Sequence, residues 1–285
     1  MTHKNDIENF TPQKRLLLCV DSDGCVIDSM NVKHKLCFGP LLIKEWHLEE
    51  YREEILALWE NFNLYSETRG TNRFRSLALV LKEVNANYRP IVGIGNLLHW
   101  SQSEILSEDS LIEKIEANRE VDIFKKALAW SRAVNRASAE LSEELIRPFW
   151  GVESALEYAG RYADIAVVSG ASPDALEEEW KRYSLFKYAD AMLSQKDGGK
   201  TACIERLLQK GYDRAMICGD AVGDMTAAQN CGIFFYPILA GREKESWESF
   251  NACFDLFVSG QYEKAEKELK KKFIANLGGE SKCQT

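Results

Sequence analysis

Aspartates recur in two closely spaced pairs, Asp21 with Asp23 and Asp220 with Asp224. Two carboxylates so close together resist simultaneous ionisation unless a positive charge compensates them. Mg²⁺ is a natural compensator, because it prefers hard oxygen ligands and keeps several waters. Asp220 and Asp224 could instead be turn and helix-capping residues, a common use of aspartate. The presence of both pairs in one chain favours a magnesium site.

A serine and two lysines could add groups that bind phosphate. Ser169 with Gly170 places a hydroxyl beside a permissive stretch of backbone, which suits the oxygens of a phosphate. Lys200 lies in the first turn of a predicted helix, where a positive charge opposes the helix dipole unless an anion is close. Lys196 lies four residues earlier, in the preceding loop. We expect one of these lysines to face the site and the other to be solvated.

Three apolar runs must position these groups, and each run stops at one of them. Residues 16–20 end at Asp21, residues 165–168 end at Ser169, and residues 215–219 end at Asp220. A short, continuous apolar run is typical of a strand that is buried on both faces of a parallel sheet. Ligands bind outside the carboxyl ends of such strands. The three strands are therefore expected to deliver two carboxylates and a hydroxyl to one edge of a sheet.

The rest of the chain predicts an α/β fold with an inserted helical domain. Apolar residues at helical spacing dominate residues 30–146, and alternating strands and helices return from about residue 147. We expect a Rossmann-like three-layer core with a mostly parallel sheet, formed by residues 1–29 and 147–285. Residues 30–146 would form an all-helical cap, which begins just after the first strand and is suited to cover the site as a lid.

Finer features of the pattern give further expectations. Two more strands are expected at 189–193 and 233–236, and helices at about 173–183, at 200–210 and from Asp224 onward. One last helix is indicated by Tyr262, Ala265, Leu269 and Phe273. Residues 88–95, which include Pro90, Gly93 and Gly95, are interpreted as a connection. Most tryptophans fall at helical spacing with other apolar residues, so we expect them to pack in the core.

The ordered motifs resemble those of the haloacid dehalogenase (HAD) superfamily. Asp21-Ser22-Asp23-Gly24 follows an apolar strand, Ser169 follows a second one, a lysine begins a helix, and Gly219-Asp220-Ala221-Val222-Gly223-Asp224 completes the series. The resemblance covers about residues 14–29 and 147–240. The large helical insertion after the first motif resembles the cap of the subgroup that includes phosphoglycolate-phosphatase-like and β-phosphoglucomutase-like enzymes.

The resemblance implies a role for each motif residue. Asp21 would be the nucleophile that forms an aspartyl-phosphate, and Asp23 would be the general acid and then the base that activates water. Ser169 would hydrogen-bond the transferring phosphoryl group. Lys200 would neutralise charge, and it is preferred to Lys196 because motif lysines of this family often begin this helix. The Mg²⁺ site would be formed by Asp21, Asp220, the backbone carbonyl of Asp23, and Asp224 through water or as a partner of the other ligands.

Asp23 also implies phosphate-ester chemistry. The dehalogenases of the family lack this acid, and its phosphonoacetaldehyde-cleaving branch carries a small residue there. We therefore expect a Mg²⁺-dependent phosphatase that acts on a small phosphorylated metabolite. Two alternatives stay open. One is a phosphomutase that uses the same nucleophile on a sugar phosphate, and the other is a non-catalytic protein that binds a phospholigand or a partner.

A cluster of three arginines between residues 69 and 75 could recognise an anionic group of the substrate. If a helix has begun by then, Arg69 and Arg73 share one face at a spacing of four residues. Two like charges there cost energy unless an anion is near, and arginine binds carboxylate or phosphate with two hydrogen bonds. We expect Arg69 and Arg73 to bind substrate, with ion pairing to acidic surface residues as the alternative.

The composition narrows the partners and the compartment. The formal net charge of −8 argues against a general surface for nucleic acid or anionic membranes. No apolar stretch approaches the roughly 20 residues needed to cross a bilayer, and the polar N-terminus lacks the apolar core of a signal peptide. The eight cysteines form no CxxC pair, so we expect reduced thiols in a cytoplasmic protein. Both a monomer and a homodimer stay open.

Overall fold

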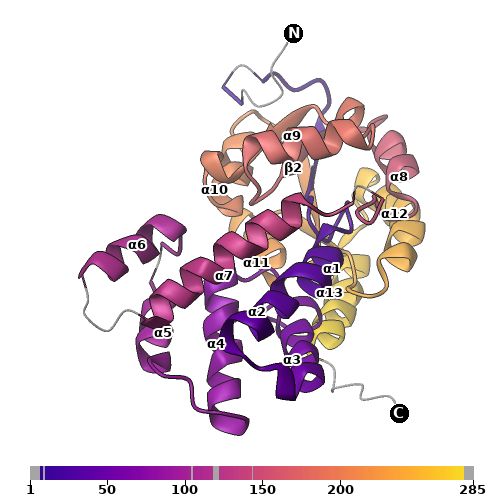
Figure 1. Ribbon diagram of the computed structural model, residues 1–285. Coiled ribbons are helices and arrows are strands. Elements are labelled where there is room, and N and C mark those ends of the chain that lie inside the picture. Colours follow the sequence, from indigo (N-terminus) through magenta and orange to yellow (C-terminus); the bar gives the residue numbers. More distant parts are fainter. Residues whose placement is uncertain (1–6, 9, 104, 118–121, 143, 279–285) are drawn as a thin grey trace. The chain divides into compact units, whose positions relative to one another are not determined.

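The computed structural model describes residues 7–8, 10–103, 105–117, 122–142 and 144–278 (Figure 1). The chain divides into two compact units. The first unit comprises Met1–Ser29 and Ile146–Thr285, and the second unit comprises Met30–Leu145. Each unit has a buried apolar cluster of its own.

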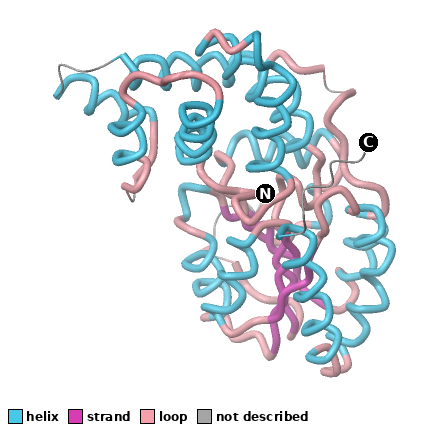
Figure 2. Tube along the Cα trace, turned by 90° about the horizontal axis from the view of Figure 1, so that it is seen from below, coloured by secondary structure: helices cyan, strands magenta, loops and turns pink. Residues whose placement is uncertain are grey.

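Within the described residues, the first unit is built on a parallel sheet of five strands in the order β3-β2-β1-β4-β5. The strands are β1 (Leu16–Val20), β2 (Ala163–Val168), β3 (Ala191–Leu193), β4 (Arg214–Gly219) and β5 (Phe234–Pro237). β1 is central, because Leu16 lies opposite Ala163 of β2 on one side and opposite Arg214 of β4 on the other. Figure 2 shows the strands in magenta with helices around them. The predicted parallel sheet is confirmed.

Helices cover both faces of this sheet, which gives the expected three layers. On one face, α8 (Val152–Ala159), α9 (Pro173–Arg182) and α12 (Glu243–Val258) contribute to a single apolar cluster that also contains Leu18 and Val20 of β1. α10 (Lys200–Leu208) and α11 (Val222–Cys231) pack against each other and against strands of the sheet. Successive strand residues point to opposite faces, so Cys19 of β1 is buried toward α10 and α11.

Two helices follow the last strand, whereas the apolar spacing predicted only one. α13 (Glu263–Gly278) contains three of the four residues that indicated the expected helix. α12 precedes it and was not predicted, although its apolar residues also repeat at helical spacing. The side chain of its N-cap residue, Arg242, accepts no hydrogen bond from the backbone N–H groups of the first turn. The usual start signal of a helix is therefore missing from this part of the sequence.

The described part of the second unit contains helices and no strand, as expected. Its elements are α1 (Ser29–Lys33), a π-helical turn (His34–Phe38), α2 (Gly39–Trp46), α3 (Arg52–Leu64), α4 (Arg73–Asn87), α5 (Ile94–Trp100), α6 (Glu108–Ala117) and α7 (Asp122–Ala139). Trp59 and Trp130 meet edge to face in its core, with ring centroids 5.7 Å apart. α5 begins at Ile94, so the expected connection ends two residues earlier than residue 95.

The lengths of the helices and the state of the cysteines can also be compared with the expectations from the sequence. None of the helices in the described ranges is both long enough and apolar enough to cross a lipid bilayer. The cysteines in these ranges are free thiols, and Cys283 lies outside them. Burial raises the pKa of the Cys19 thiol above its ordinary value, which keeps this thiol protonated and unreactive.

Glu266 of α13 protects the free edge of β5. Its carboxylate accepts the buried N–H of Phe235 at 2.8 Å and pairs with Lys270 at 2.7 Å. Glu266→Ala should lower the free energy of unfolding by about 1–3 kcal/mol, because a buried N–H loses its acceptor. Chemical denaturation measures this loss. Glu263→Ala is the control on the same helix, since Glu263 is exposed, and it should leave stability almost unchanged. Equal losses would show that Glu266 does not protect the edge.

Candidate active site

The central strands of the sheet end at the predicted site residues. Asp21 follows β1, and its backbone N–H donates to the carbonyl of Cys218 at 3.0 Å, which continues the pairing with β4. Asp220 follows β4, and Ser169 follows the neighbouring strand β2. Because β2, β1 and β4 are adjacent and parallel, their three carboxyl ends meet at one edge of the sheet.

Asp21, Asp220 and Asp224 form a buried group of carboxylates. One carboxylate oxygen from each residue lies within 4.8 Å of the other two. The three residues are 6%, 1% and 0% exposed, respectively. Asp224 reaches the group from the first turn of α11. Three oxygens at this spacing are a donor set that suits a hard divalent cation such as Mg²⁺.

Lys200 joins two of these carboxylates. It begins α10, and its Nζ lies 2.9 Å from Oδ2 of Asp21 and forms a second ion pair with Asp224. Lys196 lies in a short 3₁₀ turn (Gln195–Asp197) and is exposed. Of the two lysines that the sequence left open, Lys200 is the one that contacts the carboxylates.

The charges in this group do not balance. Burial raises the pKa of Asp21 well above its ordinary value; Lys200 opposes this rise, whereas Asp224 and Asp220 add to it. Burial alone would lower the pKa of Lys200, but Asp21 and Asp224 raise it above its ordinary value, so its ammonium stays charged. One ammonium cannot neutralise three carboxylates. A divalent cation would supply the remaining positive charge and fits the oxygen donors.

Gly219 allows Asp224 to approach the end of β4. A Cβ atom at position 219 would overlap the Cβ and the carboxyl carbon of Asp224, so only glycine fits there. The Asp224 carboxylate also accepts the backbone N–H of Ala221 at 3.0 Å, which fixes the turn between β4 and α11. The spacing of the aspartates predicted that these carboxylates belong to the site. The requirement for glycine at position 219 could not be predicted in this way, because it depends on how the chain turns between β4 and α11.

Ser169 is buried at the end of β2. Its backbone N–H donates to the carbonyl of Leu193 at 3.0 Å, and its hydroxyl accepts the N–H of Ala171 at 3.2 Å. A hydroxyl that accepts one hydrogen bond still carries a proton that it can donate to an anion. Gly170 is exposed, and a Cβ there would meet no described atom within 4 Å, so the backbone beside Ser169 is open to a ligand.

Asp23 is half-buried and contributes no carboxylate oxygen to the group. Its Oδ1 accepts a hydrogen bond from the hydroxyl of Ser29. Ser29 was not among the predicted site residues, because a serine six residues after an aspartate carries no signal of such a contact. The bond orients the carboxyl group to which the resemblance assigns proton transfer.

The predicted arginine pair in the second unit does not form. Asn72 caps α4, which begins at Arg73, so Arg69 precedes this helix and does not share its face. Arg69 is only 2% exposed, and its guanidinium donates to a backbone carbonyl at 2.9 Å. Arg73 donates to Oδ1 of Asn135 at 2.6 Å and lies over the ring of Phe38. Both arginines are thus engaged within the second unit, and their expected helical pairing was wrong.

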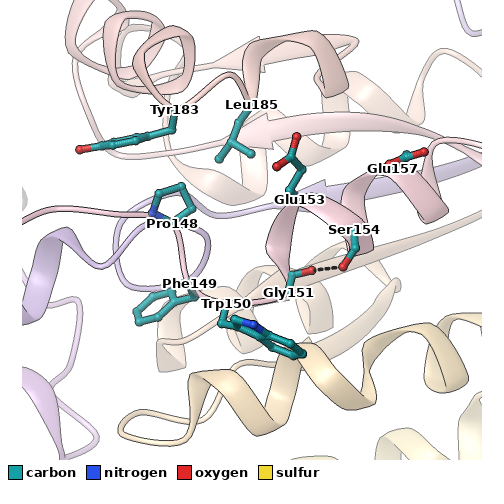
Figure 3. Close-up of a pocket in the computed structure, with 9 residues that line it drawn as sticks. All are labelled: Pro148, Phe149, Trp150, Gly151, Glu153, Ser154, Glu157, Tyr183 and Leu185. Atoms are coloured by element: carbon teal, nitrogen blue, oxygen red, sulfur yellow. Dashed lines mark hydrogen bonds between the residues drawn. The ribbon is translucent and has the colours of Figure 1, made fainter. Parts of the chain in front are cut away.

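A separate cavity of about 510 Å³ lies in the first unit, beside α8 and the segments that precede α8 and follow α9 (Figure 3). Its lining residues are 148–151, Glu153, Ser154, Glu157, Tyr183 and Leu185. None of them is a predicted site residue. Glu153 is 3.1 Å from both Lys187 Nζ and Tyr188 Oη. Because the charged side chains that line the cavity are glutamates, it is poorly suited to a phosphate group.

The sequence itself matches a known family. Residues 97–238, about half of the chain, match the family model described as "Haloacid dehalogenase-like hydrolase". This range includes Ser169, Lys200, Asp220 and Asp224, and it begins after Asp21 and Asp23. No curated protein sequence matches the chain.

Solved structures with low sequence identity resemble this chain. A conserved haloacid dehalogenase-like protein of unknown function from Agrobacterium tumefaciens is 17% identical, with a TM-score of 0.50 over 85% of this chain and 98% of that chain. A haloacid dehalogenase-like family hydrolase from Streptococcus pneumoniae is 15% identical, with a TM-score of 0.48 over 82% and 90% of the two chains. A "predicted phosphoglycolate phosphatase" from Haemophilus somnus is 13% identical, with a TM-score of 0.47 over 86% and 89%. At these identities the likeness concerns the fold alone.

Gly219→Ala should push the Asp224 carboxylate out of the buried group. We expect the free energy of unfolding to fall by about 1–3 kcal/mol, the usual cost of an extra methyl group in a packed site. The affinity for Mg²⁺ or Mn²⁺, measured by isothermal titration calorimetry, should also fall. Gly223→Ala is the matched control in α11, because a Cβ at position 223 would meet nothing within 4 Å. If Gly223→Ala lowered stability and metal affinity as much as Gly219→Ala does, the close approach of Asp224 would not be the reason for glycine at position 219.

Proposed function

This chain belongs to the haloacid dehalogenase-like hydrolases, and we propose that it is a Mg²⁺-dependent phosphatase of a small phosphorylated metabolite. The observation that carries the proposal is the buried group of Asp21, Asp220 and Asp224 with Lys200. Phosphoryl transfer is mainly a problem of positioning and of stabilising negative charge. The group is suited to that problem, because Asp21 lies beside the charged ammonium of Lys200 and shares a set of oxygen donors for a divalent cation with Asp220 and Asp224.

In the first half of the reaction, a carboxylate oxygen of Asp21 attacks the phosphorus of the ester. The bond from phosphorus to the alcohol oxygen breaks as the new bond forms, which leaves an aspartyl-phosphate at Asp21. Asp23 gives its proton to the departing oxygen, so the alcohol leaves uncharged. The hydrogen bond from Ser29 supports this role, because it orients the Asp23 carboxyl group.

In the second half, the Asp23 carboxylate takes a proton from a water molecule while the water oxygen attacks the same phosphorus. The bond between phosphorus and Asp21 breaks. Inorganic phosphate leaves, the Asp21 carboxylate is restored, and Asp23 is again an acid. The two aspartates therefore have different tasks, which agrees with their different surroundings: Asp21 contacts Lys200 and Asp23 contacts Ser29.

Ser169 and Lys200 would bind the oxygens of the phosphoryl group. The Ser169 hydroxyl has a proton to donate, and Lys200 keeps its charge because Asp21 and Asp224 raise its pKa. Fixed donors of this kind stabilise charge that develops in the transition state without having to reorganise.

Asp21, Asp220, Asp224 and the backbone carbonyl of Asp23 would hold Mg²⁺. When bound, the cation would neutralise phosphate oxygens and orient the ester toward the nucleophile. The group of carboxylates supports this assignment through its oxygen donors and its excess negative charge.

We also propose that the second unit is the cap that selects the substrate. The chain leaves the first unit after Ser29 and returns at Ile146. The second unit is therefore inserted directly after the segment that carries Asp21 and Asp23. An insertion at this point is suited to enclose a small phosphorylated substrate and to control the access of water to the aspartyl-phosphate.

Phosphate release from p-nitrophenyl phosphate and a panel of phosphorylated metabolites tests the proposal. The protein should release phosphate with Mg²⁺ and should stop when EDTA removes it. Asp21→Asn should lower kcat at least about 10³-fold, because the amide is a poor nucleophile. Asp213→Asn makes the same change beside the amino end of β4, where Asp213 pairs with Arg15, and should retain kcat.

Three outcomes would count against this proposal. Release that persists in Asp21→Asn would contradict the nucleophile, and release that survives EDTA would contradict the metal. Isomerisation of a sugar phosphate without net phosphate release would identify a mutase instead of a phosphatase.

Lys200→Ala and Lys196→Ala form a matched pair that separates the two lysines. Lys200→Ala should lower kcat by about 10²–10³-fold, comparable with the loss of one oxyanion-binding donor. Lys196→Ala should leave kcat almost unchanged, because Lys196 is exposed. Steady-state kinetics measure both effects, and circular dichroism checks that both variants are folded. A larger loss in Lys196→Ala would reverse the assignment.

A further inference from the structure

The turn that carries Asp21 and Asp23 is organised around the residue between them. Ser22 is completely buried. Its carbonyl accepts the backbone N–H groups of Val26 and Ile27, each at 3.0 Å. Gly24 adopts a φ of +81°, which favours glycine, and its N–H donates to the carbonyl of Ile27 at 2.8 Å. The turn is thus closed on itself at Ser22.

The side chain of Ser22 is held by a tryptophan from a distant part of the chain. Trp180 of α9 is completely buried, and its Nε1–H donates to the Ser22 hydroxyl oxygen at 2.9 Å. A second buried indole, Trp247 of α12, donates to the carbonyl of Cys25 at 3.0 Å. The two helices α9 and α12, both labelled in Figure 1, therefore each donate one hydrogen bond to this turn. These tryptophans pack in the core as expected, but they also bind backbone or hydroxyl oxygens beside the candidate nucleophile.

The hydrogen-bonded pair of Trp180 and Ser22 lies within an apolar cluster, where packing alone would not require polar groups. Leu18 and Val20 of β1 belong to the same apolar cluster as Trp180, and the Ser22 hydroxyl meets this cluster at Trp180. A hydroxyl buried there costs free energy unless it is hydrogen-bonded, and an apolar pair of similar shape would be about as stable. What the indole and hydroxyl add is direction, because an indole N–H can only donate and must meet an acceptor in line.

We propose that Trp180 is a positioning residue, which holds the turn of Asp21 and Asp23 in its catalytic geometry through the hydroxyl of Ser22. The inference rests on the proposed function. α9 begins at Pro173, four residues after Ser169, so one helix is tied to both the phosphate-binding serine and the turn of the nucleophile. A displaced nucleophile loses rate steeply, since a misplacement of about 1 Å can cost about 10²-fold.

The test is a double-mutant cycle of Trp180→Phe, which removes the N–H and keeps a ring, and Ser22→Ala, which removes the acceptor. With p-nitrophenyl phosphate and Mg²⁺, each single variant should lower kcat about 10-fold or more and leave KM nearly unchanged. The kcat of the double variant should be no lower than that of the less active single variant, because both substitutions remove the same hydrogen bond. Tyr262→Phe is the control: it also removes one buried donor to a carbonyl of the first unit, that of Phe235 on β5.

Hydrogen exchange at the amides of Val26 and Ile27 gives a readout that does not need catalysis. Exchange there should be faster in Trp180→Phe than in the unsubstituted protein and should stay unchanged in Tyr262→Phe. The inference is overturned if Trp180→Phe lowers kcat no more than Tyr262→Phe does, or if the two losses simply add. If the unsubstituted protein releases no phosphate, the proposed function fails, and unchanged exchange in Trp180→Phe would then overturn the inference separately.

Discussion

Burying three carboxylates beside one ammonium is the constraint on which the rest of the first unit depends. Charged groups lose their hydration on burial, and this cost is recovered only where partners are held at close range. Lys200 is such a partner, because its Nζ lies 2.9 Å from Asp21 and also pairs with Asp224, but a single charge cannot balance three carboxylates. The excess negative charge makes the carboxylates repel one another, so the surrounding elements must hold them together.

The fold meets this constraint with strand ends and helix starts. β1 and β4 are paired in register up to Val20 and Cys218, so the residues that follow these strands have little freedom. Asp224 and Lys200 come from the first turns of α11 and α10, and these two helices pack on each other. Each charge is therefore carried by an element with its own core contacts. The close approach of Asp224 to Gly219 shows how little space is left between these elements.

The sheet edge could be predicted because its signal is local. The carboxyl-terminal part of each of these buried strands is apolar, so the first polar residue after it marks the edge, and Asp21, Ser169 and Asp220 all follow this rule. The contacts that the sequence did not predict join residues with no common pattern. Trp180 and Ser22 are 158 positions apart, and their hydrogen bond depends on how α9 packs. The shared face expected for Arg69 and Arg73 depended on a helix that contains both residues, and α4 begins only at Arg73.

The position of Asp23 depends on more than its own turn. At the point where the chain leaves the first unit, the N–H of Asp28 donates to the carbonyl of Arg147 at 2.9 Å, so the outgoing and returning segments are joined. Ser29, the last residue of the outgoing segment, holds the Asp23 carboxyl group. Asp21, in contrast, is fixed by its backbone hydrogen bond to β4 and by Lys200. Within the proposed mechanism, Ser29 therefore orients the carboxyl group that transfers protons, while the sheet and Lys200 fix the nucleophile.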